Sequence, residues 1–120
     1  MNIPLCLHGL SADLILPNAV LKNLDVAEIL AKWDMDQESE LESNKLIDIV
    51  GNEYDKSIDG VREMAFKKVF NATMSHDLSA YICEDLGLIL RCDGKKAFSY
   101  WLEKRESIYI DGYVPFMRLA

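Results

Sequence analysis

The amino-acid sequence predicts a mainly helical fold, a bundle of about five helices around one core. Apolar residues recur every three or four positions along several stretches of the chain, as on the buried side of a helix. Residues that commonly cap helices precede several of these stretches, and glycines follow some of them. With 120 residues, the chain is long enough to bury about two-thirds of its unfolded surface. The sequence therefore predicts a single helical domain over residues 1–120.

The first third of the chain predicts an irregular apolar segment followed by one helix. Residues 5–16 are rich in leucine and isoleucine without a helical period, which favours a short N-terminal strand or a packed arm. Pro17-Asn18 is a typical helix start, and apolar residues then recur at helical spacing as far as Trp33. We therefore expect a strand or arm and then one continuous helix.

The middle of the chain predicts two helices joined by polar links. Residues 34–40 are polar and fit a loop or the first turn of a helix. Ser39 or Ser43 is a suitable cap for a helix that Gly51 ends. Asp59 is a suitable cap for the next helix, whose apolar residues recur at helical spacing after it.

The last third predicts two further helices. Ser75 is a good cap for the most regular apolar stripe of the chain, which should end at Asp93-Gly94. A final helix should start near Phe98. Residues 108–115 fit either the end of this helix, stopped by Gly112, or a hairpin with a two-residue turn. The apolar spacing favours the helix.

Acidic residues are concentrated in residues 34–63. This segment contains ten acidic and three basic residues, so it accounts for the net charge of −7 of the whole chain. Such a segment either steers association with a basic partner or forms a solvated face that only keeps the protein in solution. On the first alternative, the candidate partner-binding residues are Asp34, Asp36, Glu38, Glu40, Glu42, Asp48, Glu53, Asp55 and Asp59.

The sequence contains no motif that predicts catalysis, a cofactor or a metal site. Asp55–Gly60 matches the first half of a calcium loop, but Phe66 occupies the position that requires a bidentate glutamate. His8 and His76 are far apart, and neither has a second ligand at zinc spacing. The isoelectric point near 4.7 argues against direct binding of nucleic acid. We expect a protein that is not an enzyme.

The cysteines and the apolar segments predict a cytoplasmic protein that does not enter a membrane. Cys6, Cys83 and Cys92 form no C-x-x-C pair, which suits a reducing compartment. The N-terminal segment lacks the basic start of a signal peptide. No stretch approaches the roughly 20 apolar residues of a membrane span.

Residues 60–115 resemble a segment of small uncharacterised helical bacterial proteins. In these, a helix with the pattern D-x-x-x-x-[IV]-x-x-D-[FL]-x-L-I precedes a shorter helix that ends in Y-x-x-G-x-[VI]-P. Residues 77–89 match the first pattern, and residues 109–115 match the second. The resemblance implies a helix rather than a hairpin near the C-terminus.

The size, charge and helical class are also similar to those of bacterial immunity proteins, which neutralise nuclease toxins delivered between cells. This resemblance implies a non-enzymatic inhibitor whose acidic surface covers the cleft of a basic, nuclease-like toxin. Two other functions are open at this point. One is an acidic phosphate mimic that occupies a DNA-binding protein. The other is a structural or regulatory helical module that oligomerises, for example as a homodimer, through its aromatic C-terminus.

Overall fold

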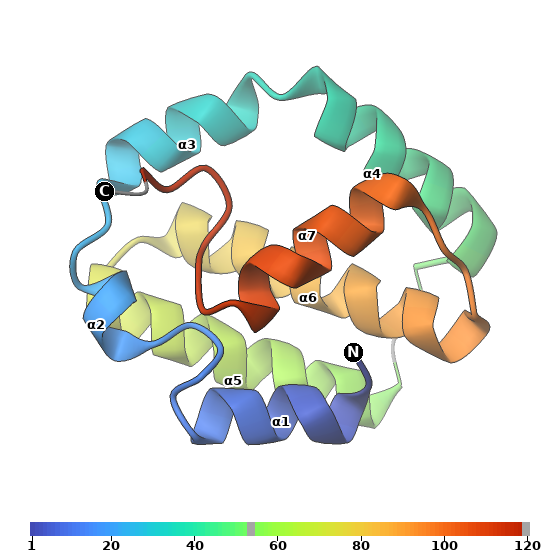
Figure 1. The fold of residues 1–120 in the computed structure, drawn as a ribbon, viewed down its shortest axis with the longest axis horizontal. Helices are drawn as coiled ribbons and strands as arrows, with labels where there is room; N and C mark the ends of the chain where they lie inside the picture. Colours follow the sequence, from blue (N-terminus) through green and yellow to red (C-terminus); the bar gives the residue numbers. More distant parts are fainter. Residues whose placement is uncertain (53–54, 119–120) are drawn as a thin grey trace.

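The computed structural model describes residues 1–52 and 55–118 (Figure 1). The mainly helical class is confirmed, although the described residues form seven helices rather than about five, and none of them forms a strand. The helices are α1 (Ile3–Ser11), α2 (Asn18–Leu21), α3 (Val26–Asp34), α4 (Gln37–Val50), α5 (Lys56–Thr73), α6 (His76–Lys95) and α7 (Tyr100–Ile110).

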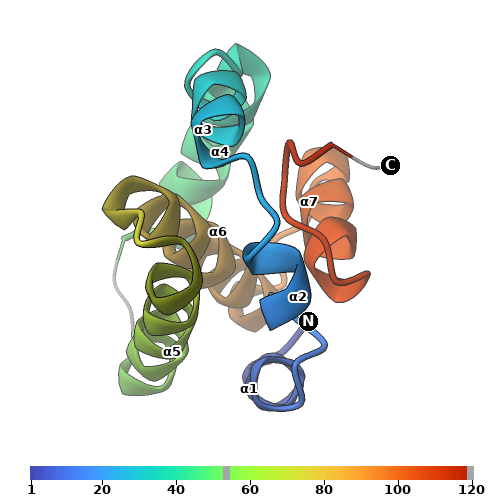
Figure 2. The ribbon, with the colours of Figure 1, turned by 90° about the vertical axis from the view of Figure 1, so that its left-hand side faces the viewer.

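The two longest helices, α5 and α6, pack against each other and form the centre of the fold (Figure 1). Helices α1 and α2 lie against α5, whereas α3 and α4 lie against α6, and α4 also contacts α7. Figure 2 shows α3 and α4 as an outer layer, with α3 at the opposite end of the molecule from α1. The C-terminal end of α4 lines a hollow together with the start of α1. The radius of gyration is 13.4 Å, close to the roughly 13.6 Å expected for a compact globule of this length.

The core lies mainly between α5 and α6. Val61, Ala65 and Val69 of α5 are buried, as are Leu78 and Ile82 of α6. Much of α6 is buried, yet no helix among the described residues is long and apolar enough to cross a membrane.

A helix, α1, replaces the strand or arm predicted near the N-terminus. The side chain of Asn2 caps it by accepting a hydrogen bond from the backbone N–H of Leu5. Cys6 and Leu10 of α1 are buried, whereas Leu5 and Leu14 are 60% and 58% exposed. The prediction was wrong because these exposed leucines mask the helical spacing of the buried residues.

The single helix predicted to begin at Pro17-Asn18 is divided into α2 and α3. Asp25 starts α3 as its N-cap, because its side chain accepts a hydrogen bond from the backbone N–H of Glu28. Aspartate competes in this way with continuation of a helix. The apolar spacing carries across the break, so periodicity alone does not show it.

Aspartates, rather than the predicted residues, cap α4 and α5. Asp36 accepts a hydrogen bond from the backbone N–H of Ser39, and Asp55 accepts one from that of Ile58 at 2.8 Å. Asp55–Gly60, the calcium-like segment, is therefore the cap and the first turn of α5. Gly51 follows α4 with φ of 80°, as predicted for the end of this helix.

The two C-terminal helices follow the sequence prediction more closely. Ser75 caps α6, but this helix continues through Asp93-Gly94 to Lys95. The break predicted there was wrong, because a glycine in a helix costs only about 1 kcal/mol and α6 is firmly packed. Helix α7 begins after Ser99 and ends at Ile110, with Gly112 beyond it at φ of 82°. This result confirms the helix over the hairpin for residues 108–115.

Candidate functional site

Most of the predicted acidic residues lie at the outer layer of the fold. The junction of α3 and α4, together with α4 itself, carries Asp34, Asp36, Glu38, Glu40, Glu42 and Asp48. Asp55 and Asp59 lie instead at the start of α5, and Glu53 lies outside the described residues. The acidic segment is therefore divided among the end of α3, α4 and the start of α5.

A hollow of about 340 Å³ opens between the α3–α4 junction, α6 and α7. Three of the predicted acids line it, namely Asp34, Asp36 and Glu40. Three aromatic side chains, one Arg and one further Asp from distant parts of the sequence also line it: Trp33, Tyr81, Trp101, Arg105 and Asp85. Tyr81 donates a hydrogen bond to Asp34 at 2.6 Å across this hollow.

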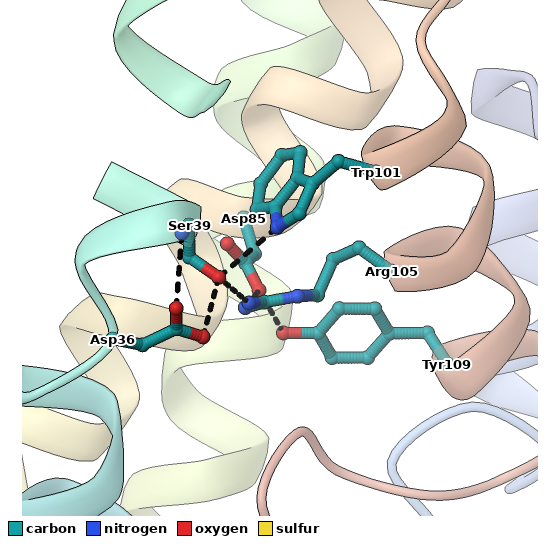
Figure 3. A network of polar contacts seen from close by, with 6 residues as sticks. All are labelled: Asp36, Ser39, Asp85, Trp101, Arg105 and Tyr109. Carbon is teal, nitrogen blue, oxygen red and sulfur yellow. Dashed lines mark hydrogen bonds and ion pairs between the residues drawn. The ribbon is translucent and has the colours of Figure 1, made fainter. Parts of the chain in front are cut away.

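Ser39 is the centre of a polar network at the base of the hollow (Figure 3). Its hydroxyl donates to Asp36 Oδ2 at 2.7 Å. The same oxygen accepts hydrogen bonds from Trp101 Nε1 at 3.0 Å and from Arg105 Nη2 at 2.7 Å. A serine hydroxyl has one donor and two acceptor sites, so Ser39 uses all three. The first turn of α4 is thereby joined to α7.

The network continues from α7 to α6 through an ion pair (Figure 3). Arg105 Nη1 lies 2.8 Å from Asp85 Oδ2, and the two side chains are only 6% and 12% exposed. The hydroxyl of Tyr109 donates to the same Asp85 oxygen at 2.7 Å. Burial and the neighbouring Asp85 raise the pKa of Tyr109 well above its usual value, so its hydroxyl keeps the proton that it donates.

Aromatic rings surround the guanidinium group of Arg105. Its central carbon lies 5.1 Å from the ring centroid of Trp33, 5.0 Å from that of Trp101 and 5.3 Å from that of Phe116. Each contact falls within the range of a cation–π interaction. Arg105 thus connects α7 to α3 and to the C-terminal segment as well as to α4 and α6.

The network affects the protonation of both its carboxyl groups. Burial alone would raise the pKa of Asp36, but the hydrogen bonds from Ser39 and the charge of Arg105 outweigh burial, so this pKa is lowered. Burial also raises the pKa of Asp85, and there Arg105 and Tyr109 oppose the rise without cancelling it. Asp36 is therefore the network carboxylate that favours folding at neutral pH.

We expect Asp36→Asn to lower the free energy of unfolding by about 1 kcal/mol at pH 7, because the amide oxygen still caps α4 but the charge near Arg105 is lost. In the wild type, the lowered pKa stabilises the fold above the unfolded value of about 3.9. This contribution is lost as the pH falls through the lower pKa of the folded state. Urea denaturation at pH 7 and pH 3 should therefore show a difference between the two proteins that shrinks in acid. If the difference in unfolding free energy between the two proteins is the same at pH 7 and pH 3, this interpretation of Asp36 is contradicted. Asp48→Asn, on the exposed side of α4, serves as the control.

The acids differ in whether the protein itself neutralises them. Glu42 pairs with Lys45 at 3.5 Å, and Asp59 pairs with Arg62 at 3.6 Å. The side chains of Glu38, Glu40 and Asp48 are exposed, and within residues 1–52 and 55–118 they form neither an ion pair nor a hydrogen bond. Three carboxylates of the segment that lack such a partner therefore lie on α4.

The sequence does not show that Asp85, Trp101, Arg105 and Tyr109 belong to a common site. A signal for two of them is present in the sequence. Asp85 follows Ile82 on the apolar stripe of α6, and Arg105 lies on the apolar stripe of α7. Charged residues at such positions indicate a buried pair.

The three cysteines of the chain are buried. Burial raises the pKa of the Cys6 thiol to about 11, and burial also raises the pKa of Cys83 and of Cys92. A thiol with a raised pKa is a poor nucleophile at neutral pH. In the part of the chain that the structure describes, no three His, Cys, Asp or Glu side chains are grouped to hold a metal ion.

A helical fold that presents unpaired carboxylates on a firmly anchored outer helix has the features of a small protein-binding domain. Residues 6–116 match the family model of the immunity protein PIM1, and the chain belongs to this family. This confirms the resemblance to toxin-immunity proteins, and membership implies a toxin as binding partner. Comparisons with curated proteins and with solved structures gave no match.

Proposed function

We propose that this protein is a non-enzymatic immunity inhibitor that binds a basic, nuclease-like toxin in the cytoplasm. The match to an immunity family over residues 6–116 is the observation that carries the proposal. The acidic surface of α3 and α4 would lie over the basic substrate cleft of the toxin. Nucleic acid would then be excluded from the cleft, because both ligands require the same positive charges.

The free carboxylates on α4 support the electrostatic part of this proposal. Complementary charge mainly raises the association rate and fixes the orientation of two partners. The gain is roughly 10- to 1,000-fold at low salt. A rapid association suits an inhibitor that must bind a toxin before the toxin reaches its substrate.

Depletion of the protein during co-culture tests the proposal. The chromosomal gene is replaced by an inducible copy, and cells without inducer are grown together with their parent strain. We expect the depleted cells to lose viability, with degraded DNA or RNA, and the induced copy to restore survival. Survival of depleted cells would contradict an immunity function. If the depleted cells die while their DNA and RNA stay intact, the immunity function stands and only the nuclease-like nature of the toxin is contradicted.

A self-associating helical module is the second candidate, and exposed side chains near α7 favour it. Phe98 and Tyr100 are exposed, and Phe98 lines a hollow of about 500 Å³ between α6 and α7. Tyr113 is exposed as well, whereas Tyr109 is buried and Trp101 belongs to the polar network. Light scattering distinguishes the two candidates, because only the self-associating module gains mass with concentration.

A further inference from the structure

We propose that the outer stripe of α4 is the surface that contacts the toxin, and that it fits a toxin surface with apolar side chains surrounded by Lys and Arg. The stripe consists of Glu38, Leu41, Glu42, Lys45, Asp48 and Ile49. This inference rests on the proposed immunity function and assigns toxin binding to one face of α4.

Helix geometry places these residues on one side of α4. Positions three, four and seven apart lie along the same side of an α-helix. The opposite side of α4 is turned inward, since Ser39, Leu46 and Val50 are buried. The residues of the stripe are exposed, apart from Glu42, which is half-buried.

Large apolar side chains are exposed along the stripe. Leu41 is 57% exposed and Ile49 is 70% exposed, and Met35 is exposed just before α4. A solvated face that serves only to keep a protein in solution does not require such residues. An amphipathic helix with apolar residues at this spacing is a common contact in protein recognition. Leu41 and Ile49 are therefore the expected apolar anchors.

The charges of the stripe indicate the chemistry of the partner. Glu38 and Asp48 lie at its two ends and have no partner within the described residues, whereas Glu42 and Lys45 between them form a pair. The corresponding acids on α5 are paired, Asp59 with Arg62 and Glu63 with Lys67 at 2.7 Å. Lys or Arg of a partner would neutralise Glu38 and Asp48. Their negative charge disfavours nucleic acid and anionic membrane surfaces as alternatives.

The polar network prepares this surface for binding. Asp36 and Ser39 fix the first turn of α4, and Arg105 holds Ser39 from α7. A surface that is already in its bound arrangement loses less conformational freedom when it binds. The stripe therefore differs from a mobile acidic tail.

Variants expressed in the depleted cells test the inference, with matched controls elsewhere on the chain. We expect L41A/I49A to reduce survival in co-culture about tenfold or more, and E38Q/D48N to reduce it about fivefold, through weaker and slower binding. The controls are L5A/L14A, which shortens equally exposed leucines near α1, and D59N/E63Q, which removes the same charge from α5. Both should protect like the wild type at equal protein level, and circular dichroism checks that each variant is folded.

Each outcome of this experiment is decisive. Equal protection by the α4 variants and their controls overturns the inference and leaves the immunity function in place. If the wild-type protein itself fails to protect depleted cells, both the immunity function and the inference about α4 are contradicted. A loss of self-association in L41A/I49A with unchanged protection would show that the stripe joins two copies of the chain, which also overturns the inference.

Discussion

Replacing Asp85 with alanine should lower the free energy of unfolding by about 3–5 kcal/mol, the largest stability effect that we expect from a single change. The guanidinium group of Arg105 is buried. Without Asp85 it loses its only ion pair among the described residues, and the hydroxyl of Tyr109 loses its acceptor as well. Both groups would then be left in the polar network without the carboxylate that joins α6 to α7.

Chemical denaturation followed by circular dichroism measures this effect. Glu84→Gln is the matched control, because it removes a carboxylate from the next position of the same helix. Glu84 forms a surface pair with Arg62 and is 57% exposed, so the change should cost less than about 1 kcal/mol. A similarly small cost for Asp85→Ala would show that the buried pair does not hold α6 and α7 together.

Replacing Ser39 with alanine should lower the free energy of unfolding by about 2–3 kcal/mol, the second large effect. The change removes the acceptor of the indole N–H of Trp101 and one acceptor of Arg105, both of which are turned into the protein. Leaving a buried donor without a partner costs about 1–3 kcal/mol. The first turn of α4 also loses its connection to α7, so protection in co-culture should decrease along with stability.

Ser43→Ala is the control for this prediction. Ser43 lies on the same helix, but its hydroxyl donates only to the carbonyl oxygen of Glu40 in the preceding turn. Alanine favours helices, so the free energy of unfolding should change by less than about 0.5 kcal/mol. Equal effects of the two substitutions would contradict a special role of Ser39.

The helices that the sequence predicted well are those in which apolar spacing and caps agree. The apolar stripe after Ser75 corresponds to α6, and the apolar spacing that extends to Tyr109 corresponds to α7. One of the errors occurred where two local signals compete. Asp36 and Ser39 are both good caps three residues apart, and only tertiary contacts draw Ser39 inward to Arg105.

The negative charge of the candidate site was predictable from the sequence, but the polar network that holds α4 in place was not. The acids of α4 are visible as a local excess of charge, and their exposure follows from their polarity. The network joins α4 to residues on α6 and α7 that are 40 or more positions away, such as Asp85 and Arg105. A single sequence places these residues on the apolar sides of their helices without showing which charges meet.

The most direct test is the association rate constant between the purified protein and the purified toxin that kills depleted cells, measured by stopped flow over a range of salt concentrations. We predict that E38Q/D48N lowers this rate about tenfold at low salt and flattens its dependence on salt, whereas D59N/E63Q does neither. An E38Q/D48N variant that associates like the wild type at every salt concentration would contradict the assignment of toxin binding to the acidic face of α4.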